Sequence, residues 1–152
     1  TASMGLPTPE KFERAGQLAV SLGYVGLTDQ HHVRLSWLKP GRIATSPWFH
    51  QRGDLFRMAE RASGAHLEGQ IALAEWMHRA ATTLRFHGGQ AILITDGMAH
   101  PADFFRALHV LMVRNLEIKV IQVLSPQELH PAKLLRGEKI SEFTPVPIEL
   151  IR

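Results

Sequence analysis

Hydroxyl and carboxylate side chains stand at two points of the chain where a parallel sheet would hold a ligand. Thr1 and Ser3 lie one residue apart, and Asp96 follows an apolar run at residues 91–94. In open parallel sheets, ligands bind beyond the carboxyl ends of the strands. Hard oxygen ligands of this kind suit Mg²⁺ or Mn²⁺ better than Zn²⁺. The same spacing also fits a simpler interpretation, in which Thr1 and Ser3 are turn residues and Asp96 is either a residue that leads into the next helix or a solvated loop residue.

The sequence has nine histidines, but their spacing does not predict a zinc site. His31 and His32 are neighbours, so on a strand their side chains point to opposite faces. No pair has the H-E-x-x-H spacing that places two imidazoles on one face of a helix. His66 and His100 fall at the ends of predicted elements. We therefore expect the histidines to be structural or solvated.

The first half of the chain predicts a helix, two short strands and a second helix. Thr8 can cap a helix over residues 9–26, whose apolar side chains recur at helical spacing. Residues 31–38 alternate apolar and polar side chains, as a half-buried strand does. Residues 43–45 can pair back onto that strand as a short edge strand. A second helix is predicted at about residues 50–62.

The second half of the chain alternates helices with apolar strands. A helix is predicted at about residues 67–86, and the continuous apolar run at residues 91–94 indicates a parallel strand covered on both faces. Another helix begins near Pro101, and residues 118–124 predict a further apolar strand. Residues 131–152 are rich in proline and predict an irregular tail.

This order of elements predicts an α/β fold of three layers. Helices would cover both faces of a mostly parallel, doubly wound (Rossmann-like) sheet with one antiparallel edge strand. We treat residues 1–152 as one domain. Such a fold normally begins with a strand, so a strand before Thr1 would complete the first strand–helix–strand unit. Without it, the strands at residues 31–38 and 91–94 would face a gap, which favours a fragment, a strand from a partner chain or a rearranged sheet.

Composition narrows the class of protein. The 152 residues make a 17.0 kDa chain, the size of one domain. Lys and Arg exceed Asp and Glu by 17 to 14 with no basic stripe, so we expect no nucleic-acid partner. The absence of cysteine excludes disulfides and thiolate chemistry, and suits a cytoplasmic protein. No apolar run approaches the roughly 18 residues of a membrane segment.

Three short segments, in this order, resemble the metal loops of a von Willebrand factor A (VWA) domain. The segment TASMG at residues 1–5 resembles the end of the family's D-x-S-x-S-M-G loop. The segment GAHLEG at residues 64–69 lies where the second loop should fall. The segment ITDG at residues 94–97 resembles the third loop, in which a strand ends in a hydroxyl residue, Asp and Gly.

Within that superfamily, the chain is similar to the bacterial domain-of-unknown-function family fifty-eight. The similar segments are KFERA at residues 11–15 and VIQVLSPQEL at residues 120–129, which resembles a strand ending in D-P-x-E-L. The resemblance implies a three-layer sandwich with a metal-ion-dependent adhesion site (MIDAS), where the metal is shared with an acidic group of a partner protein. Such domains mostly bind proteins and are not enzymes. Members of the family often accompany MoxR-type AAA+ ATPases and are often membrane-associated through upstream helices.

The resemblance also implies a set of ligands for Mg²⁺ or Mn²⁺, namely Thr1, Ser3 and Asp96. The leading Asp of the first loop would lie two residues before Thr1. The Thr of the second loop is replaced by Ala65 or His66, and Ser125 stands where the family often has Asp. We therefore expect a weakened or lost metal site. His66 is a substitute ligand that would shift the metal preference away from Mg²⁺.

The sequence is compatible with three functions. The first is a protein–protein interaction module of VWA type, not an enzyme, with a degenerate MIDAS and a MoxR-type AAA+ ATPase as partner. The alternative is a small metal-assisted hydrolase or phosphotransfer domain that uses Asp96 with His66 or His100. That alternative requires these side chains to converge within about 5 Å. The third is a structural fragment that self-associates through its sheet edge.

Overall fold

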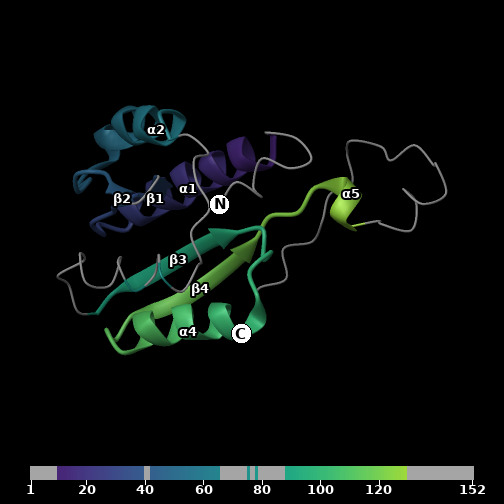
Figure 1. The fold of residues 1–152 in the computed structure, drawn as a ribbon. Helices are drawn as coiled ribbons and strands as arrows, with labels where there is room; N and C mark the ends of the chain where they lie inside the picture. The colour runs from purple at the N-terminus through teal and green to yellow at the C-terminus, as the bar shows by residue number, and fades with distance from the viewer. Residues whose placement is uncertain (1–9, 40–41, 66–74, 76–77, 79–87, 130–152) are drawn as a thin grey trace.

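The computed structural model describes residues 10–39, 42–65, 75, 78 and 88–129 (Figure 1). Helices and strands are mixed, which confirms the predicted α/β class. The elements, in chain order, are α1 (Glu10–Thr28), β1 (Ser36–Lys39), β2 (Arg42–Thr45), the 3₁₀ helix η2 (Arg52–Asp54), α2 (Leu55–Ser63), β3 (Gln90–Thr95), α4 (Pro101–Met112), β4 (Glu117–Gln122) and α5 (Pro126–Leu129).

The first core lies between α1, α2 and the segments around β1 and β2. Leu27 of α1 and Met58 of α2 are buried together with Phe49. A Cβ atom at Gly23 would lie 2.7 Å from the Sδ atom of Met58, so this glycine lets the two helices approach closely. The helical spacing that predicted residues 9–26 thus reflects a real apolar face, and α1 extends two residues beyond it.

β1 and β2 form the predicted antiparallel pair, with Ser36 opposite Thr45. The first strand begins at Ser36, not at residue 31 as predicted. The reason is that the Leu35 N–H donates to the Oγ atom of buried Ser46 at 3.0 Å, so a side chain replaces a backbone partner there. Pairing resumes further out as an isolated bridge between Val33 and Phe49.

The second predicted helix, at residues 50–62, is divided into η2 and α2. The carboxylate of Asp54 accepts hydrogen bonds from the backbone N–H groups of His50 at 3.0 Å and Gln51 at 3.3 Å. These bonds hold the chain in a turn before α2 begins at Leu55. The apolar spacing predicted the helix but not this side-chain-stabilised turn.

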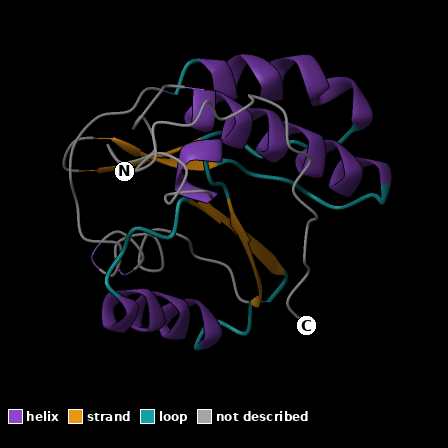
Figure 2. Ribbon diagram, turned by 90° about the vertical axis from the view of Figure 1, so that its right-hand side faces the viewer, coloured by secondary structure: helices purple, strands orange, loops and turns teal. Residues whose placement is uncertain are grey.

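β3 and β4 are parallel, from Gln90 opposite Glu117 to Thr95 opposite Gln122. The predicted strands at residues 91–94 and 118–124 and the helix from Pro101 are therefore confirmed, with strand ends shifted by one or two residues. α4 crosses between the strands and packs on them through a second core, made of Leu93, Ala107, Leu111 and Leu116. β3 and β4 lie between α1 and α4 (Figures 1 and 2).

The described strands form one parallel and one antiparallel pair, which are separate two-stranded sheets. The expected cover on both faces of β3 holds for Leu93, which is buried, but not for Ile92, which is 38% exposed. Of the helix predicted at residues 67–86, only residues 75 and 78 are described, and both are helical. The tail at residues 131–152 lies outside the described residues. Over the described ranges, no helix has the length and apolar character needed to cross a bilayer.

Candidate functional site: a buried lysine between two carboxylates

β3 and β4 end together, so their carboxyl ends form one edge of the parallel pair. The last paired residues are Thr95 and Gln122, and Asp96 follows directly. The start of α1 lies beside this edge, because the Nζ atom of Lys11 is 3.9 Å from the Oδ2 atom of Asp96. The same Nζ atom is 2.8 Å from the Oε1 atom of Glu128 in α5. We call Lys11, Asp96 and Glu128 the edge triad.

Asp96 is held rigidly by the turn that follows β3. It is 2% exposed, and its Oδ1 atom accepts a hydrogen bond from the Met98 N–H at 3.2 Å. Gly97 has φ +74°, a conformation that glycine adopts without strain. The Gln122 amide also donates to the Asp96 carbonyl at 3.1 Å, so β4 fixes the same turn. Asp96 is therefore not the solvated loop residue of the simpler interpretation.

Lys11 is a buried cation in the first turn of α1. Its side chain is 2% exposed, and the positive end of the helix dipole does not favour an ammonium group there. Burying an unpaired charge is costly, so a lysine in this position needs anionic partners. Glu128 supplies a direct hydrogen bond, and Asp96 adds a second negative charge at ion-pair distance.

Glu128 is positioned by a capping box at the start of α5. Its Oε2 atom accepts the Ser125 N–H at 2.7 Å, and its own N–H donates to the Ser125 Oγ atom at 3.3 Å. Burial acts to raise the pKa of Glu128, but the hydrogen bonds from Lys11 and Ser125 outweigh it. The pKa of this carboxyl therefore lies below its ordinary value of 4.5.

Of the predicted metal ligands, the structure describes Asp96 alone and places it at the expected edge. Thr1, Ser3 and His66 lie outside the described residues. The sequence reasoning missed Lys11 and Glu128. A signal for Glu128 was present in the Ser-x-x-Glu spacing, which is typical of a capping box. Nothing in the sequence indicates that Lys11 contacts it.

The divalent metal that the resemblance implies is a poor fit to the described part of this edge. The Oδ2 atom of Asp96 is buried and accepts no hydrogen bond, so the charge of this carboxylate needs a nearby cation. Lys11 already provides that cation. A Mg²⁺ ion binds carboxylate oxygen at about 2.1 Å, so on Oδ2 it would lie within about 6 Å of Nζ and be repelled. In the part of the chain that the structure describes, no cluster of three or more His, Asp or Glu side chains could hold a metal.

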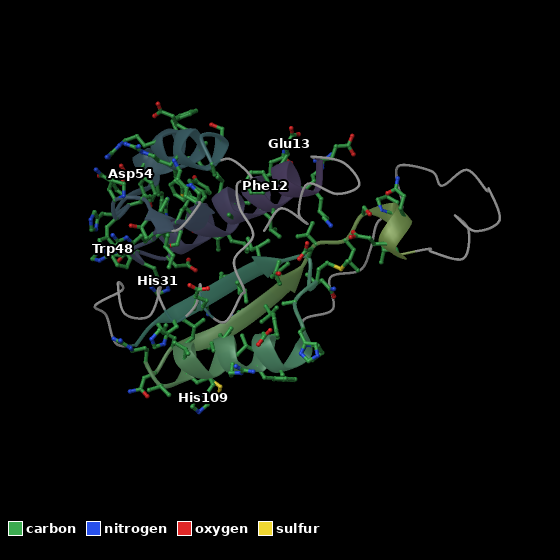
Figure 3. All side chains as sticks on the ribbon, viewed as in Figure 1. Phe12, Glu13, His31, Trp48, Asp54 and His109 are labelled. Carbon is green, nitrogen blue, oxygen red and sulfur yellow. The ribbon has the colours of Figure 1, made fainter. Side chains whose placement is uncertain are left out.

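The described histidines do not converge on the edge triad. Figure 3 shows His31 near the end of α1 and His109 on α4, on opposite sides of the strands. His100 uses its Nδ1 atom to accept the Ala102 N–H at 3.3 Å, which caps α4. Within the described ranges, no hydrogen bond or ion pair joins His100 to Asp96. The described contacts of Asp96 and His100 therefore give no support to the convergence that a hydrolase built on these two residues requires, and His66 lies outside the described residues.

Comparisons with protein-family models, curated proteins and solved structures find no match to this chain. The arrangement of its own residues is therefore the basis for a functional proposal.

Proposed function

We propose that the chain is a protein–protein interaction module of VWA type with a degenerate MIDAS, and that its partner is a MoxR-type AAA+ ATPase. The finer fold in this proposal is a three-layer, doubly wound sandwich. One observation carries it: the turn after a parallel strand, with its buried Asp96, faces the first turn of α1 through Lys11 at 3.9 Å. A VWA site requires this meeting of the third loop with the helix that follows the first loop.

Electrostatics favour binding over catalysis at this edge. Asp96 and Glu128 share the ammonium of Lys11, so neither carboxylate stands free to take a proton from a substrate. Met98, in the turn after Asp96, is 66% exposed and presents a flexible apolar side chain of a kind common at protein interfaces. A partner would therefore contact the turn at Met98, and the edge triad would keep that turn in its conformation.

The test is a binding measurement with a purified MoxR-type AAA+ ATPase. The informative variant is Met98→Glu, which places a charge on the proposed contact surface. Met112→Glu is the matched control, because Met112 is 61% exposed at the far end of α4. We expect the first variant to weaken binding at least tenfold and the second to leave it unchanged.

Two results would count against this function. One is a wild-type chain that does not bind the ATPase. The other is equal loss of affinity in both methionine variants, which would remove the edge of β3 and β4 from the interface. Circular dichroism of both variants would establish that each remains folded.

A further inference from the structure

The edge triad is unusual because its three charged side chains lie together with little exposure to solvent. Two carboxylates and one ammonium meet at the end of a parallel strand pair, and the ammonium is the most deeply enclosed of the three. The triad joins parts of the chain that are far apart, since Lys11 and Glu128 are separated by 117 positions. Such a contact exists only in the folded state, where it joins the start of α1 to the end of the described chain at this edge.

The two carboxylates of the triad differ in how many of their oxygens accept hydrogen bonds. Glu128 accepts a 2.8 Å hydrogen bond from Lys11 on one oxygen and a 2.7 Å bond from the Ser125 N–H on the other. Asp96 accepts one bond on Oδ1, whereas its buried Oδ2 accepts none and faces Lys11 at 3.9 Å. Lys11 thus compensates a charge that would otherwise be buried without a counter-charge.

We propose that the ammonium of Lys11 is the resident cation of this edge and takes the place of a divalent metal. The inference rests on the proposed function and deepens it: the interaction surface is held in shape by an internal lysine, so partner binding does not depend on Mg²⁺ or Mn²⁺. The charge of the lysine also excludes a divalent ion from Asp96, because the two cations would lie within about 6 Å of each other in a buried site.

The lysine arrangement has a chemical consequence for the partner. In a MIDAS, an acidic group of the partner completes the coordination of the metal. Here the side chain that carries the cation is 2% exposed and already bonded to Glu128, so an acidic group of a partner cannot reach it from the surface. The partner therefore has no need of an acidic residue at this point, and neutral or apolar contacts around Met98 take its place.

The experiment exchanges one cation for the other. Mn²⁺ binding and melting temperature are measured for the wild type, Lys11→Met, Lys11→Gln, and each Lys11 variant combined with Asp96→Asn. Lys119→Met is the matched control, because it removes an exposed lysine from β4. A ligand that binds only the folded state raises the melting temperature.

The wild type and Lys119→Met should not respond to Mn²⁺. The single Lys11 variants should melt lower in chelator, and Mn²⁺ at ten times its Kd should raise their melting temperature by about 4 °C. Adding Asp96→Asn should abolish that rise.

Wild-type Mn²⁺ binding that Asp96→Asn abolishes would overturn the inference. So would folded Lys11→Met and Lys11→Gln chains that ignore Mn²⁺. Where neither Lys11 variant folds with or without Mn²⁺, calorimetric titration of the wild type decides the question, since a wild type that takes no Mn²⁺ supports the resident lysine. None of these measurements uses the ATPase, so failure of the proposed partner would be seen separately.

Discussion

Two buried aspartates show how differently one residue type is used in the two halves of this molecule. Asp54, beside α2, is 6% exposed and has partners on both oxygens: the N–H groups of His50 and Gln51 on Oδ2, and Arg57 at 2.8 Å on Oδ1. Asp96, after β3, is equally enclosed but leaves Oδ2 without a hydrogen bond.

Both carboxylates face a cation, but Asp54 is hydrogen-bonded on both oxygens by residues close to it in the chain, whereas Asp96 is not. Asp54 holds a turn, and every bond it makes is local in sequence. Asp96 is incompletely bonded by its own turn and depends on a lysine from a distant helix. A buried polar atom without a hydrogen bond is rare in folded proteins. The Oδ2 atom of Asp96 is therefore more informative about function than the fully hydrogen-bonded carboxylate of Asp54.

The largest effect should come from removing the cation of the edge triad. Lys11→Met leaves Asp96 and Glu128 without their counter-charge, and breaking a buried ion pair in this way costs about 3–5 kcal/mol. We expect a loss of that size in the free energy of unfolding, measured by urea denaturation. Lys119→Met should change it by less than about 0.5 kcal/mol, because its ion pair is exposed. Equal losses in the two variants would mean that the triad carries no special stability.

The two aspartates can be compared directly by the same substitution. Asp54→Asn replaces an oxygen that accepts N–H groups or Arg57, so we expect a loss of about 2 kcal/mol. Asp96→Asn removes the more distant of the two carboxylate charges beside Lys11, which keeps its 2.8 Å bond to Glu128, and should cost about 1 kcal/mol. Denaturation midpoints in the reverse order would contradict the contrast between a carboxylate that is fully hydrogen-bonded by its own turn and one that is not.

The turn that carries Asp96 can be tested through its glycine. Gly97→Ala forces a side chain into φ +74° and brings a Cβ atom within 2.5 Å of the Gln122 amide nitrogen, so it should cost about 1–2 kcal/mol. Gly16→Ala is the control, because Gly16 lies inside α1 with open space around it. That control should raise the melting temperature, since alanine favours a helix by about 1 kcal/mol over glycine.

The smallest effect concerns acid stability. The folded-state pKa of Glu128 is below 4.5 and that of Asp54 is below 3.8. Each ionised carboxylate therefore contributes stability that is fully present above those values and is lost as pH falls through the folded-state pKa. Glu128→Gln should flatten the dependence of unfolding free energy on pH between about 5 and 3. An unaltered slope in Glu128→Gln would contradict its pairing with Lys11.

Most of the described elements could be predicted because their signals are local. The apolar face of α1 and the apolar runs of β3 and β4 are readable from spacing, and their observed ends lie within two residues of the predicted ones. The errors occur where a polar side chain takes over a backbone hydrogen bond, as Ser46 does before β1 and Asp54 does before α2. Periodicity carries no information about such bonds.

The candidate site was only partly predictable. Asp96 could be placed because it follows an apolar strand, and the carboxyl end of a strand is a general location for ligands. Lys11 looks like an ordinary surface lysine in the sequence, since its role depends on Glu128 at the other end of the chain. The predicted ligands Thr1, Ser3 and His66, and the implied metal and ATPase, stay predictions.

The wide separation of Lys11 and Glu128 also has a meaning for the order of folding. Closing a loop of 117 positions costs roughly 4 kcal/mol of chain entropy, far more than closing the turn at Asp54. The contact should therefore form late, after the local turns and the β3–β4 pair have shortened the effective loop. Interactions absent from the folding transition state govern how fast the native protein opens. We therefore expect loss of the edge triad to raise the unfolding rate of the protein while changing its folding rate very little.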